Sequence, residues 1–479
     1  MATRMFIDGE WCDATSGTTE EATSPATGES LGPVAWGDRV DARQAIAAAN
    51  AAFQAWGGRT GFERAMYLHR AADVMERRAD ELARVLTLDQ GKPLKAEAEV
   101  EVGELVEFFR MAAEDGKRVE GTIPQSAAPG RRVLLLRRPR GVLGLITPWN
   151  WPYTMPAEVL APALACGCTV VWTPAPSTAV CSGVLAECVA EADLPPGVFN
   201  FVIGPGPEVG DELAVNPGTH AVAFTGSTET GLIVARQAAG KAQLLEMGGN
   251  GPLVVMDDAD LPAAAEAARV GSFLGAGQSC SAAERILVHD AVREEFVELL
   301  AAEVANEVRL GDPLDDATTM GPVNNEPGAV KMDAHVADAV ERGAIVVTGG
   351  SRAEGFPTRL YWQPTVLNDV PPDSIAVTQE TFGPIAPVVG IGSLEEAIEQ
   401  TNAQTYGLMA AIFTRDLGAG MRYADSVAMG LVNINETTNY WEPHLPWGGR
   451  ARSQSGIGRV GGMYPMETLT ELQTVLIHA

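Results

Sequence analysis

One cysteine of this chain, Cys280, lies in a run of small residues, Gly-Ala-Gly-Gln-Ser-Cys-Ser-Ala-Ala-Glu-Arg, which covers residues 275–285. Glycines allow the backbone to approach a ligand closely. A cysteine in such a turn can attack a substrate while its own N–H faces the negative charge that develops. A lone cysteine is more often a small buried apolar residue. Nucleophilic catalysis is therefore a hypothesis that needs matching groups elsewhere in the chain.

Three other segments carry groups that would complete such a site. Glu246 precedes two glycines in the run Glu-Met-Gly-Gly-Asn, and Asn150 lies between two prolines in Pro-Trp-Asn-Trp-Pro. Glu380 and Phe382 share a further run, Gln-Glu-Thr-Phe-Gly-Pro. A carboxylate can act as a general base, and a side-chain amide can stabilise an oxyanion. Each run alone is a weak signal.

Composition limits the class of protein. The chain has 479 residues, of which 46% are hydrophobic, and its formal net charge is -28. This length predicts two or three domains, and the negative charge argues against nucleic acid or an anionic membrane as a partner. No apolar leader or membrane-length run is present.

The six cysteines form no Cys-x-x-Cys pair and have no histidines at zinc spacing. We therefore expect reduced thiols, a cytoplasmic location and no metal site.

Strands and helices alternate along most of the chain. Apolar runs at 142–146, 169–172, 198–202 and 220–224 predict strands with helices between them, and Asp41 is expected to cap an earlier helix. Residues 252–430 repeat the alternation, with strands at 253–256 and 286–289 and helices at 261–273 and 291–308. Such alternation predicts parallel sheets with right-handed crossovers.

Glycines follow two of the expected strands, in Gly204-Pro-Gly206 and in Gly226-Ser-Thr-Glu-Thr-Gly231. Turns of this kind place backbone N–H groups at a helix N-terminus, where a pyrophosphate can bind. The spacing is not that of the usual dinucleotide fingerprint. An ordinary glycine turn is the competing interpretation.

A strand with basic ends is expected at 131–138, and the last strand is expected at 468–478. An exposed apolar edge needs cover, commonly from another subunit. This segment therefore suggests oligomerisation, with an ordinary surface hairpin as the alternative.

Taken together and in order, these runs closely resemble those of the NAD(P)-dependent aldehyde dehydrogenase superfamily, over essentially the whole chain. The resemblance implies an α/β fold of two Rossmann-type parallel-sheet domains plus a small β oligomerisation arm. The dinucleotide-binding domain would comprise 1–118 and 139–247, the catalytic domain 248–446, and the arm 119–138 and 460–479. It also implies a homodimer or homotetramer.

The resemblance implies a role for each group. Cys280 is expected to be the nucleophile, Asn150 the oxyanion donor and Glu246 the base that activates water for hydrolysis. The expected cofactor is NAD or NADP, held by Ile146, Thr147, Trp149, Thr173, Gly206, Gly226, Ser227, Glu380 and Phe382. Most members have lysine at the position of Thr173, and NAD-preferring members often have glutamate at that of Pro176. Both departures leave the choice of cofactor open.

The expected aldehyde tunnel contains Trp151, Met155, Trp441 and Trp447. Its indoles favour an apolar or aromatic aldehyde, although they could equally be packing residues of the wall. Glu158, nearby, would disfavour an anionic substrate, and the substrate is a small-molecule aldehyde in either case.

Three other functions compete with hydrolytic aldehyde oxidation. A CoA-acylating dehydrogenase would generally lack Glu246. A cofactor-independent thiol esterase would not need Glu380 or the glycine turns. A non-catalytic relative would be expected to have lost Cys280 or Glu246.

Overall fold

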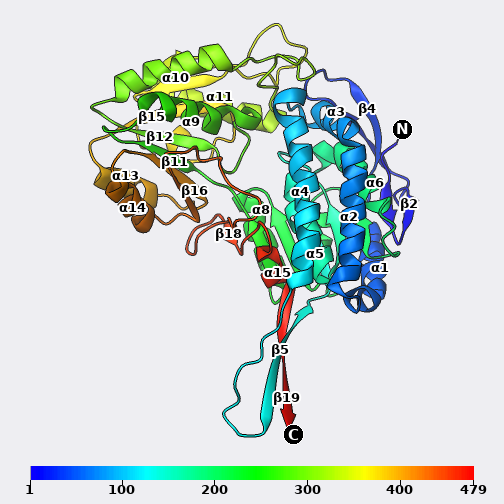
Figure 1. Ribbon diagram of the computed structural model, residues 1–479. Helices are drawn as coiled ribbons and strands as arrows, with labels where there is room; N and C mark the ends of the chain where they lie inside the picture. Colours follow the sequence, from blue (N-terminus) through cyan, green and yellow to red (C-terminus); the bar gives the residue numbers. More distant parts are fainter. Residues whose placement is uncertain (1, 479) are drawn as a thin grey trace.

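The computed structural model describes residues 2–478, and these form two α/β bodies with a two-stranded arm that projects from one of them (Figure 1). Among these residues, no helix has both the length and the apolar character needed to cross a membrane. The predicted α/β class with two parallel-sheet bodies is confirmed by the strand pairing described below.

The first body is built on an eight-stranded sheet. Its five central strands are parallel, and in spatial order they are β10 (Ala242–Glu246), β9 (Ala221–Thr225), β6 (Val142–Ile146), β7 (Thr169–Thr173) and β8 (Phe199–Phe201). The antiparallel strand β18 (Gly456–Ile457) lies beyond β10, and β1 (Met5–Ile7) and β2 (Glu10–Cys12) lie beyond β8. Strands β6, β7 and β8 are mostly apolar and almost entirely buried, as expected for parallel strands with helices on both faces.

The helices of this body and its neighbouring segments cover the sheet (Figure 1). They are α1 (Arg39–Gly57), α2 (Gly61–Arg77), α3 (Ala79–Gln90), the π-helical turn Leu94–Ala98, α4 (Glu99–Asp115), the short turn Gly116–Arg118, α5 (Thr154–Cys166), the short turn Pro176–Thr178, α6 (Ala179–Ala190), α7 (Val209–Val215), α8 (Thr228–Gln237) and α15 (Tyr464–Leu469). A separate hairpin pairs β3 (Thr19–Thr23) with β4 (Ser30–Ala35).

The expected cap of the first helix was wrong by one turn. Asp38 is the N-cap of α1, and its side chain accepts a hydrogen bond from the backbone N–H of Val40 at 2.6 Å. Asp41 lies inside the helix and accepts the backbone N–H of Asp38 at 3.1 Å. The two carboxylates form a reciprocal capping box, which is why Asp41 resembled a cap in the sequence.

The second body is built on a seven-stranded sheet. In spatial order the strands are β13 (Ile345–Thr348), β14 (Thr365–Asn368), β15 (Ile385–Ile391), β12 (Ala283–His289), β11 (Gly251–Val255), β16 (Met409–Phe413) and β17 (Leu431–Ile434). Only β13 is antiparallel to its neighbour among these strands. The helices are α9 (Leu261–Phe273), the 3-10 turn Leu274–Gly277, α10 (Arg293–Glu307), α11 (Glu326–Glu341), α12 (Ile375–Thr378), α13 (Leu394–Asn402) and α14 (Leu417–Ser426).

The arm is an antiparallel pair of β5 (Arg131–Pro139) and β19 (Thr470–His478), in continuous register from Thr470 opposite Pro139 to His478 opposite Arg131. Figure 1 shows it extending away from both bodies. The arm thus brings together two segments that lie far apart in the sequence.

The chain passes between the sheets at one short link. Strand β10 ends at Glu246 in the first sheet, and β11 begins at Gly251 in the second. Later the chain returns, and β18 pairs with the end of β10, with Glu246 opposite Gly456. Glu246 therefore lies where the two bodies meet. The domain boundaries given above stay a prediction.

Candidate active site

Two pockets meet at Cys280. The first, here called the turn pocket, has a volume of about 190 Å³ and is lined by Pro148, Trp149, Asn150, Met155, Thr225, Gly226, Ser227, Glu246, Met247, Gly248, Cys280, Lys331, Glu380 and Phe382. The second, here called the tryptophan pocket, has a volume of about 80 Å³ and is lined by Glu104, Trp151, Thr154, Met155, Leu274, Ser279, Cys280, Ser281, Met409, Asn439, Trp441 and Trp447. Cys280 and Met155 line both pockets.

The loop before Cys280 has an unusual backbone. Gly275, Ala276 and Gly277 have φ values of 62°, 53° and 70°, three left-handed residues in succession. A Cβ atom at Gly277 would lie 2.1 Å from the carbonyl oxygen of Gly383, so only glycine fits there. This close approach packs the loop against the segment that carries Glu380 and Phe382.

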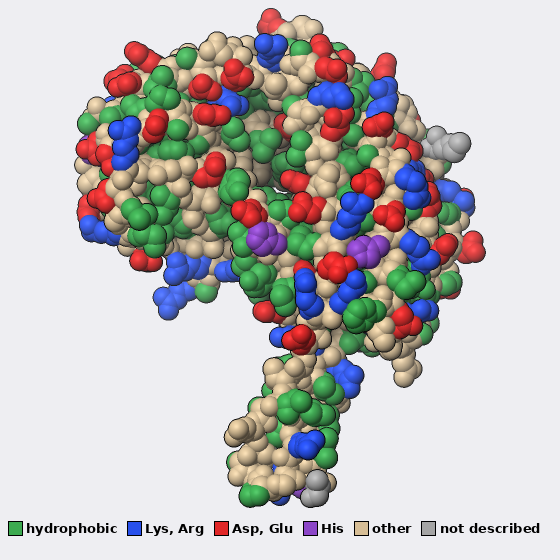
Figure 2. Space-filling model, viewed as in Figure 1, with side chains coloured by type: hydrophobic (Ala, Val, Ile, Leu, Met, Phe, Trp, Pro, Cys, Tyr) green, Lys and Arg blue, Asp and Glu red, His purple; other side chains and the backbone are tan. Residues whose placement is uncertain are grey.

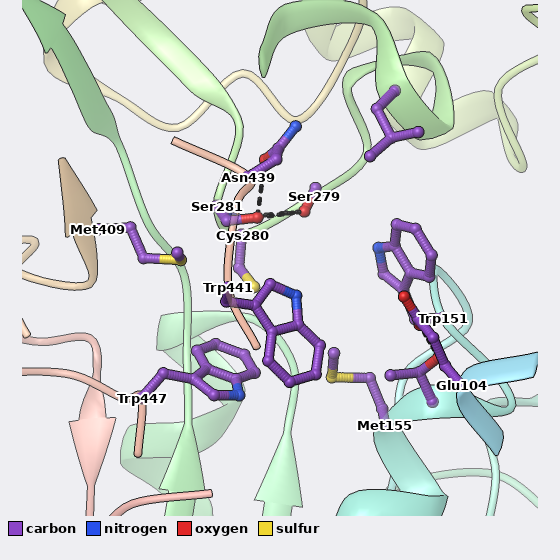
Figure 3. A pocket seen from close by; sticks show the side chains of 12 residues that line it. Glu104, Trp151, Met155, Ser279, Cys280, Ser281, Met409, Asn439, Trp441 and Trp447 are labelled. Carbon is purple, nitrogen blue, oxygen red and sulfur yellow. Dashed lines mark hydrogen bonds between the residues drawn. The ribbon is translucent and has the colours of Figure 1, made fainter. Parts of the chain in front are cut away.

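Cys280 itself is half-buried at the end of this loop and is flanked by two serines (Figure 3). The Ser279 and Ser281 hydroxyl oxygens are 2.9 Å apart, and the Ser281 hydroxyl donates to Asn439 Oδ1 at 2.8 Å. Asn439 in turn donates to the backbone carbonyl of Val270 at the end of α9. These bonds fix the orientation of the loop beside the tryptophan pocket.

The Asn150 amide points at the same loop. Its Nδ2 donates to the backbone carbonyl of Gln278 at 3.0 Å, two residues before Cys280. Gln278 is held in turn, because its side chain donates to the Gly275 carbonyl at 2.9 Å and accepts the Asn324 N–H at 2.8 Å. A side-chain amide donor is therefore placed next to the thiol on a fixed backbone.

Glu246 is buried at the end of β10, and neither of its carboxylate oxygens has a hydrogen-bond partner within residues 2–478. Burial, then the nearby Glu158 carboxyl, raises the pKa of Glu246 well above its usual value. The link after it needs Gly249, where a Cβ atom would lie 2.0 Å from the Cys280 carbonyl oxygen. The glycine allows the Glu246 segment and the Cys280 loop to touch backbone to backbone.

Burial also raises the pKa of the Cys280 thiol, and the carboxylates of Glu246, Glu380 and Glu158 raise it further. The sulfur is therefore a thiol, not a thiolate, at neutral pH in the protein without ligands. An attack by this sulfur requires that a base remove its proton. Glu246, whose carboxyl group lines the same pocket, is a candidate for this base.

Glu380 lies in a turn held by hydrogen bonds. One of its oxygens accepts the Gly249 N–H at 2.8 Å. The buried Glu284 accepts the backbone N–H groups of Thr381 and Phe382 at 2.5 and 2.7 Å. Phe382 has a φ of 59°, uncommon for a large side chain, and its ring meets Trp149 edge-on at 5.6 Å. The strained turn presents Glu380 and Phe382 to the turn pocket.

Gly226 and Ser227 open α8 at the carboxyl end of β9 and line the turn pocket. Ile146, Thr147 and Thr173 lie at the carboxyl ends of β6 and β7, outside the lining of both pockets. The Thr147 hydroxyl is already used, because it accepts the Trp172 indole N–H at 2.8 Å.

Gly206 lies just before α7, and a Cβ atom there would meet open space. These positions follow the edge of the sheet where strand-to-helix turns bind nucleotides in open α/β folds.

Trp151, Met155, Trp441 and Trp447 all line the tryptophan pocket. The rings of Trp441 and Trp447 are 5.8 Å apart at 42°, and Phe108 of α4 stacks on Trp441 at 5.9 Å. Figure 3 shows these indoles around Cys280, with Trp151 and Glu104 together on one side. The residues expected in a substrate tunnel are thus brought together beside the candidate nucleophile.

Several lining residues were missed by sequence reasoning. Glu104 and Lys331 lie in the helices α4 and α11, and neither belongs to a glycine- or proline-rich run that would attract attention. Asn439 lies in an irregular segment 158 residues after Ser281 in sequence. Only the two serines beside Cys280 could have been identified from the sequence, because they lie in the same glycine-rich run as the cysteine.

A family model, curated proteins and solved structures all match this chain over nearly its whole length. The model of the Aldehyde dehydrogenase family matches residues 11–475. The chain is 41% identical over 477 residues to the NADP⁺ succinate-semialdehyde dehydrogenase of Escherichia coli, covering 99% of this chain and 97% of that one. It is 40% identical over 478 residues to the 3-sulfolactaldehyde dehydrogenase of Pseudomonas putida, covering 99% and 96%. A Staphylococcus aureus betaine aldehyde dehydrogenase solved with NAD⁺ is 33% identical, has a TM-score of 0.96, and the match covers 99% of this chain and 95% of that one.

Proposed function

Because this chain belongs to the aldehyde dehydrogenase family, we propose that it oxidises an aldehyde to a carboxylic acid with NAD or NADP, through a covalent intermediate on Cys280. The observation that carries this proposal is the position of Cys280 between two pockets. Because the Cys280 thiol lines both pockets, it can bind the substrate carbon in one pocket while the other pocket holds the cofactor.

Cys280 acts first in the proposed sequence. After loss of its proton the sulfur attacks the aldehyde carbon and forms a thiohemiacetal. The oxyanion that develops accepts hydrogen bonds from the Asn150 amide and the Cys280 backbone N–H, and one such donor contributes about 3–4 kcal/mol in related acyl chemistry. Loss of hydride from this carbon leaves a thioester on Cys280.

Glu246 completes the turnover. Its buried carboxylate removes a proton from the water that attacks the thioester, and the acid leaves while the Cys280 thiol is restored. The raised pKa of Glu246 supports this role, because a carboxylate with a raised pKa is a stronger base once it is ionised. Since no group within residues 2–478 hydrogen-bonds to either oxygen, both can bind that water.

The turn pocket fits a nicotinamide dinucleotide, which when bound accepts the hydride. Gly226 and Ser227 at the N-terminus of α8 would hold the pyrophosphate, since the backbone N–H groups there attract anions. Glu380 would accept the hydroxyls of the nicotinamide ribose, and the Trp149–Phe382 pair would pack against the ring. Ile146, Thr147, Thr173 and Gly206 are proposed for the adenosine half.

The proposed aldehyde carries an apolar or aromatic group. Trp151, Trp441 and Trp447 line the pocket beside Cys280, and no lysine, arginine or histidine does so among residues 2–478. The two curated relatives named above act, by their names, on aldehydes that carry an acidic group.

We also propose that the arm joins subunits into a homodimer or homotetramer. An isolated two-stranded hairpin is marginally stable in water, and β19 exposes Leu472, Leu476 and Ile477. Figure 2 shows apolar side chains along the projecting arm.

The six free cysteines support a reducing, cytoplasmic location.

The test is the formation of NADH or NADPH at 340 nm with short apolar and aromatic aldehydes, with analysis of the acid formed. Wild type is expected to reduce at least one cofactor, and Cys280→Ala is expected to abolish this. Cys188→Ala, which changes a buried cysteine outside both pockets, serves as the matched control. Reduction that survives in Cys280→Ala would refute the assigned nucleophile, and reduction that appears only with CoA would refute hydrolysis.

A further inference from the structure

A buried carboxylate outside both pockets holds the loop that carries Cys280. Glu97 lies on the π-helical turn Leu94–Ala98, a rare kind of element that occurs frequently at functional sites. Its Oε1 accepts the backbone N–H of Gly275 at 3.0 Å, although the two residues are 178 positions apart in sequence. Glu97 lines neither pocket, and no step proposed above uses it.

The turn that presents Glu97 is itself attached to the second body. Leu94 donates its backbone N–H to the carbonyl of Pro313 at 2.8 Å. Shortly before the turn, the Gln90 carbonyl accepts the side-chain amide of Asn324 at 3.3 Å. Both partners lie between α10 and α11. The carboxylate therefore reaches the loop from a backbone whose position is fixed.

The loop that Glu97 holds has a strained backbone. Gly275 begins the three successive left-handed residues, and the second of them, Ala276, has a side chain and a φ of 53°. Left-handed backbone at a residue with a Cβ atom is unfavourable and persists only where surrounding contacts enforce it. The bond from the Gly275 N–H to Glu97 is one such contact, and the packing of Gly277 against Gly383 is another.

The same bond begins a series of hydrogen bonds that ends at the proposed oxyanion donor. The Gly275 carbonyl accepts the backbone N–H and the side-chain amide of Gln278 at 3.1 and 2.9 Å. The Gln278 carbonyl accepts Asn150 Nδ2 at 3.0 Å. Glu97 is thus connected in series to the Asn150 amide. Cys280 lies two residues after Gln278 on the same backbone.

The second oxygen of Glu97, Oε2, is buried and has no hydrogen-bond partner within residues 2–478. Burial raises the pKa of Glu97 to about 7, although Lys92 and the Gly275 N–H act in the opposite direction. Lys92 is already paired with Glu101, at 2.6 Å. Toward the loop, Glu97 therefore acts as a hydrogen-bond acceptor of fixed reach and not as a countercharge.

We propose that Glu97 is a positioning residue, whose carboxyl group sets the Cys280 loop and the Asn150 amide in the geometry for attack on the aldehyde. It acts through the Gly275 N–H. This rests on the proposed function, because it assigns Glu97 to the reaction at Cys280. The series of hydrogen bonds does not pass through Glu380 or the turn that opens α8, so cofactor binding should not depend on it.

Two substitutions separate reach from charge. Glu97→Gln keeps an acceptor oxygen at the same reach and removes the charge, whereas Glu97→Asp keeps the charge and shortens the side chain by one methylene group. We expect Glu97→Asp to lower kcat for aldehyde oxidation by about 10²-fold, as a displacement of about 1 Å at a reacting centre does, and to leave KM for the cofactor unchanged. Glu97→Gln should keep kcat within about threefold of wild type.

Glu99→Asp makes the same shortening at an exposed residue two positions along and should have no effect. Equal losses in Glu97→Gln and Glu97→Asp would show that charge matters, and an unimpaired Glu97→Asp would show that the bond to the loop does not. Either result would overturn the proposal. A cofactor KM that rises as much as kcat falls would show general distortion of the site and would overturn it as well.

Acylation of Cys280 by 4-nitrophenyl acetate needs no cofactor and distinguishes failure of this proposal from failure of the proposed function. The ester uses the same thiol and the same amide donor, so its acylation rate should also fall by about 10²-fold in Glu97→Asp. Equal acylation rates in wild type and Glu97→Asp would overturn the positioning role. A wild type that is acylated but reduces neither cofactor with any aldehyde would refute the proposed function alone.

A measurement on wild type does not depend on the folding of a variant. The Gly275 amide should exchange its hydrogen slowly, because its acceptor is a buried side chain. Hydrogen-exchange mass spectrometry of a peptide that covers the loop reports on this amide. Exchange as fast as that of an unprotected amide would contradict the bond to Glu97 and overturn the proposal.

Discussion

At the scale of single residues, the site combines a thiol and a carboxyl group whose pKa values are both raised by burial. After burial, the nearby Glu246, Glu380 and Glu158 raise the pKa of the Cys280 thiol further, and Glu158 raises that of Glu246. The Cys280 sulfur is therefore a thiol at physiological pH in the protein without ligands. The Cys280 thiol is consequently a weak nucleophile until a base removes its proton.

This predicts the pH dependence of thiol modification. A group with a raised pKa gains its charge as pH rises, so the thiolate fraction of Cys280 should grow about tenfold per pH unit from about pH 6 to 9. The measurement is the rate of Cys280 carbamidomethylation by iodoacetamide in the protein without cofactor, followed by peptide mass spectrometry. The half-exposed Cys12 provides an internal comparison. A rate that levels off near neutral pH would contradict a raised thiol pKa.

At the scale of elements, the site depends on where β10 ends. The link between β10 and β11 passes so close to the Cys280 loop that a single added methyl group would collide with its backbone. The same link donates the Gly249 N–H to Glu380. Glu246, Cys280 and Glu380 lie on different elements. The glycine-containing β10–β11 link and Cys280 loop therefore fix them relative to one another.

Gly249→Ala tests this coupling. The added Cβ atom would lie 2.0 Å from the Cys280 carbonyl oxygen, so the link or the loop must move. We expect kcat to fall by about 10²-fold, the cost of a displacement of about 1 Å at a reacting centre. Gly103→Ala, where an added Cβ atom on α4 meets nothing within 4 Å, should keep full activity. Both variants are compared by steady-state kinetics and thermal unfolding, and an unimpaired Gly249→Ala would disprove the close approach.

The order of the motifs predicted much of the architecture and little of its detail. The helix at 261–273 was predicted with the bounds found in the structure, because its apolar periodicity and its Asp260 cap are local signals. The motif residues Cys280, Glu246, Asn150 and Glu380 do share one pocket. Their roles stay predictions that the pocket geometry supports.

Residues outside any motif could not be found this way. Glu104 and Lys331 reach the pockets only because α4 and α11 pack there, and packing between distant helices leaves no mark in a local pattern. Asp41 shows the opposite error, since a capping box places two similar residues within one turn and the sequence alone did not distinguish them.

At the scale of the whole molecule, the arm is the feature that the isolated chain does not explain. Its two strands pair with each other, a single bridge joins Thr122 to Leu135 of β5, and the exposed fractions of Leu472 and Leu476 are both 59%. Apolar side chains on an unsupported hairpin are expected to be covered by another subunit.

The double variant Leu472→Asp/Leu476→Asp is expected to reduce the assembly to a smaller species, because charges in an apolar contact are costly to bury. Size-exclusion chromatography with light scattering measures the mass in solution. Leu417→Asp changes a comparably exposed leucine on α14 of the body and should leave the mass unchanged. A monomeric wild type, or an oligomer insensitive to the arm substitutions, would exclude the arm as the subunit contact.

The central claim is that turnover passes through a thioester on Cys280 which Glu246 releases, and Glu246→Gln tests it most directly. The amide keeps the size of the side chain but cannot accept the proton from water, so hydrolysis should slow by about 10²- to 10⁴-fold. Rapid mixing with aldehyde and cofactor should then give one burst of reduced cofactor per active Cys280. Intact-mass analysis should find the acyl group on that residue. Full steady-state turnover without a burst, or an acyl group elsewhere, would contradict the account.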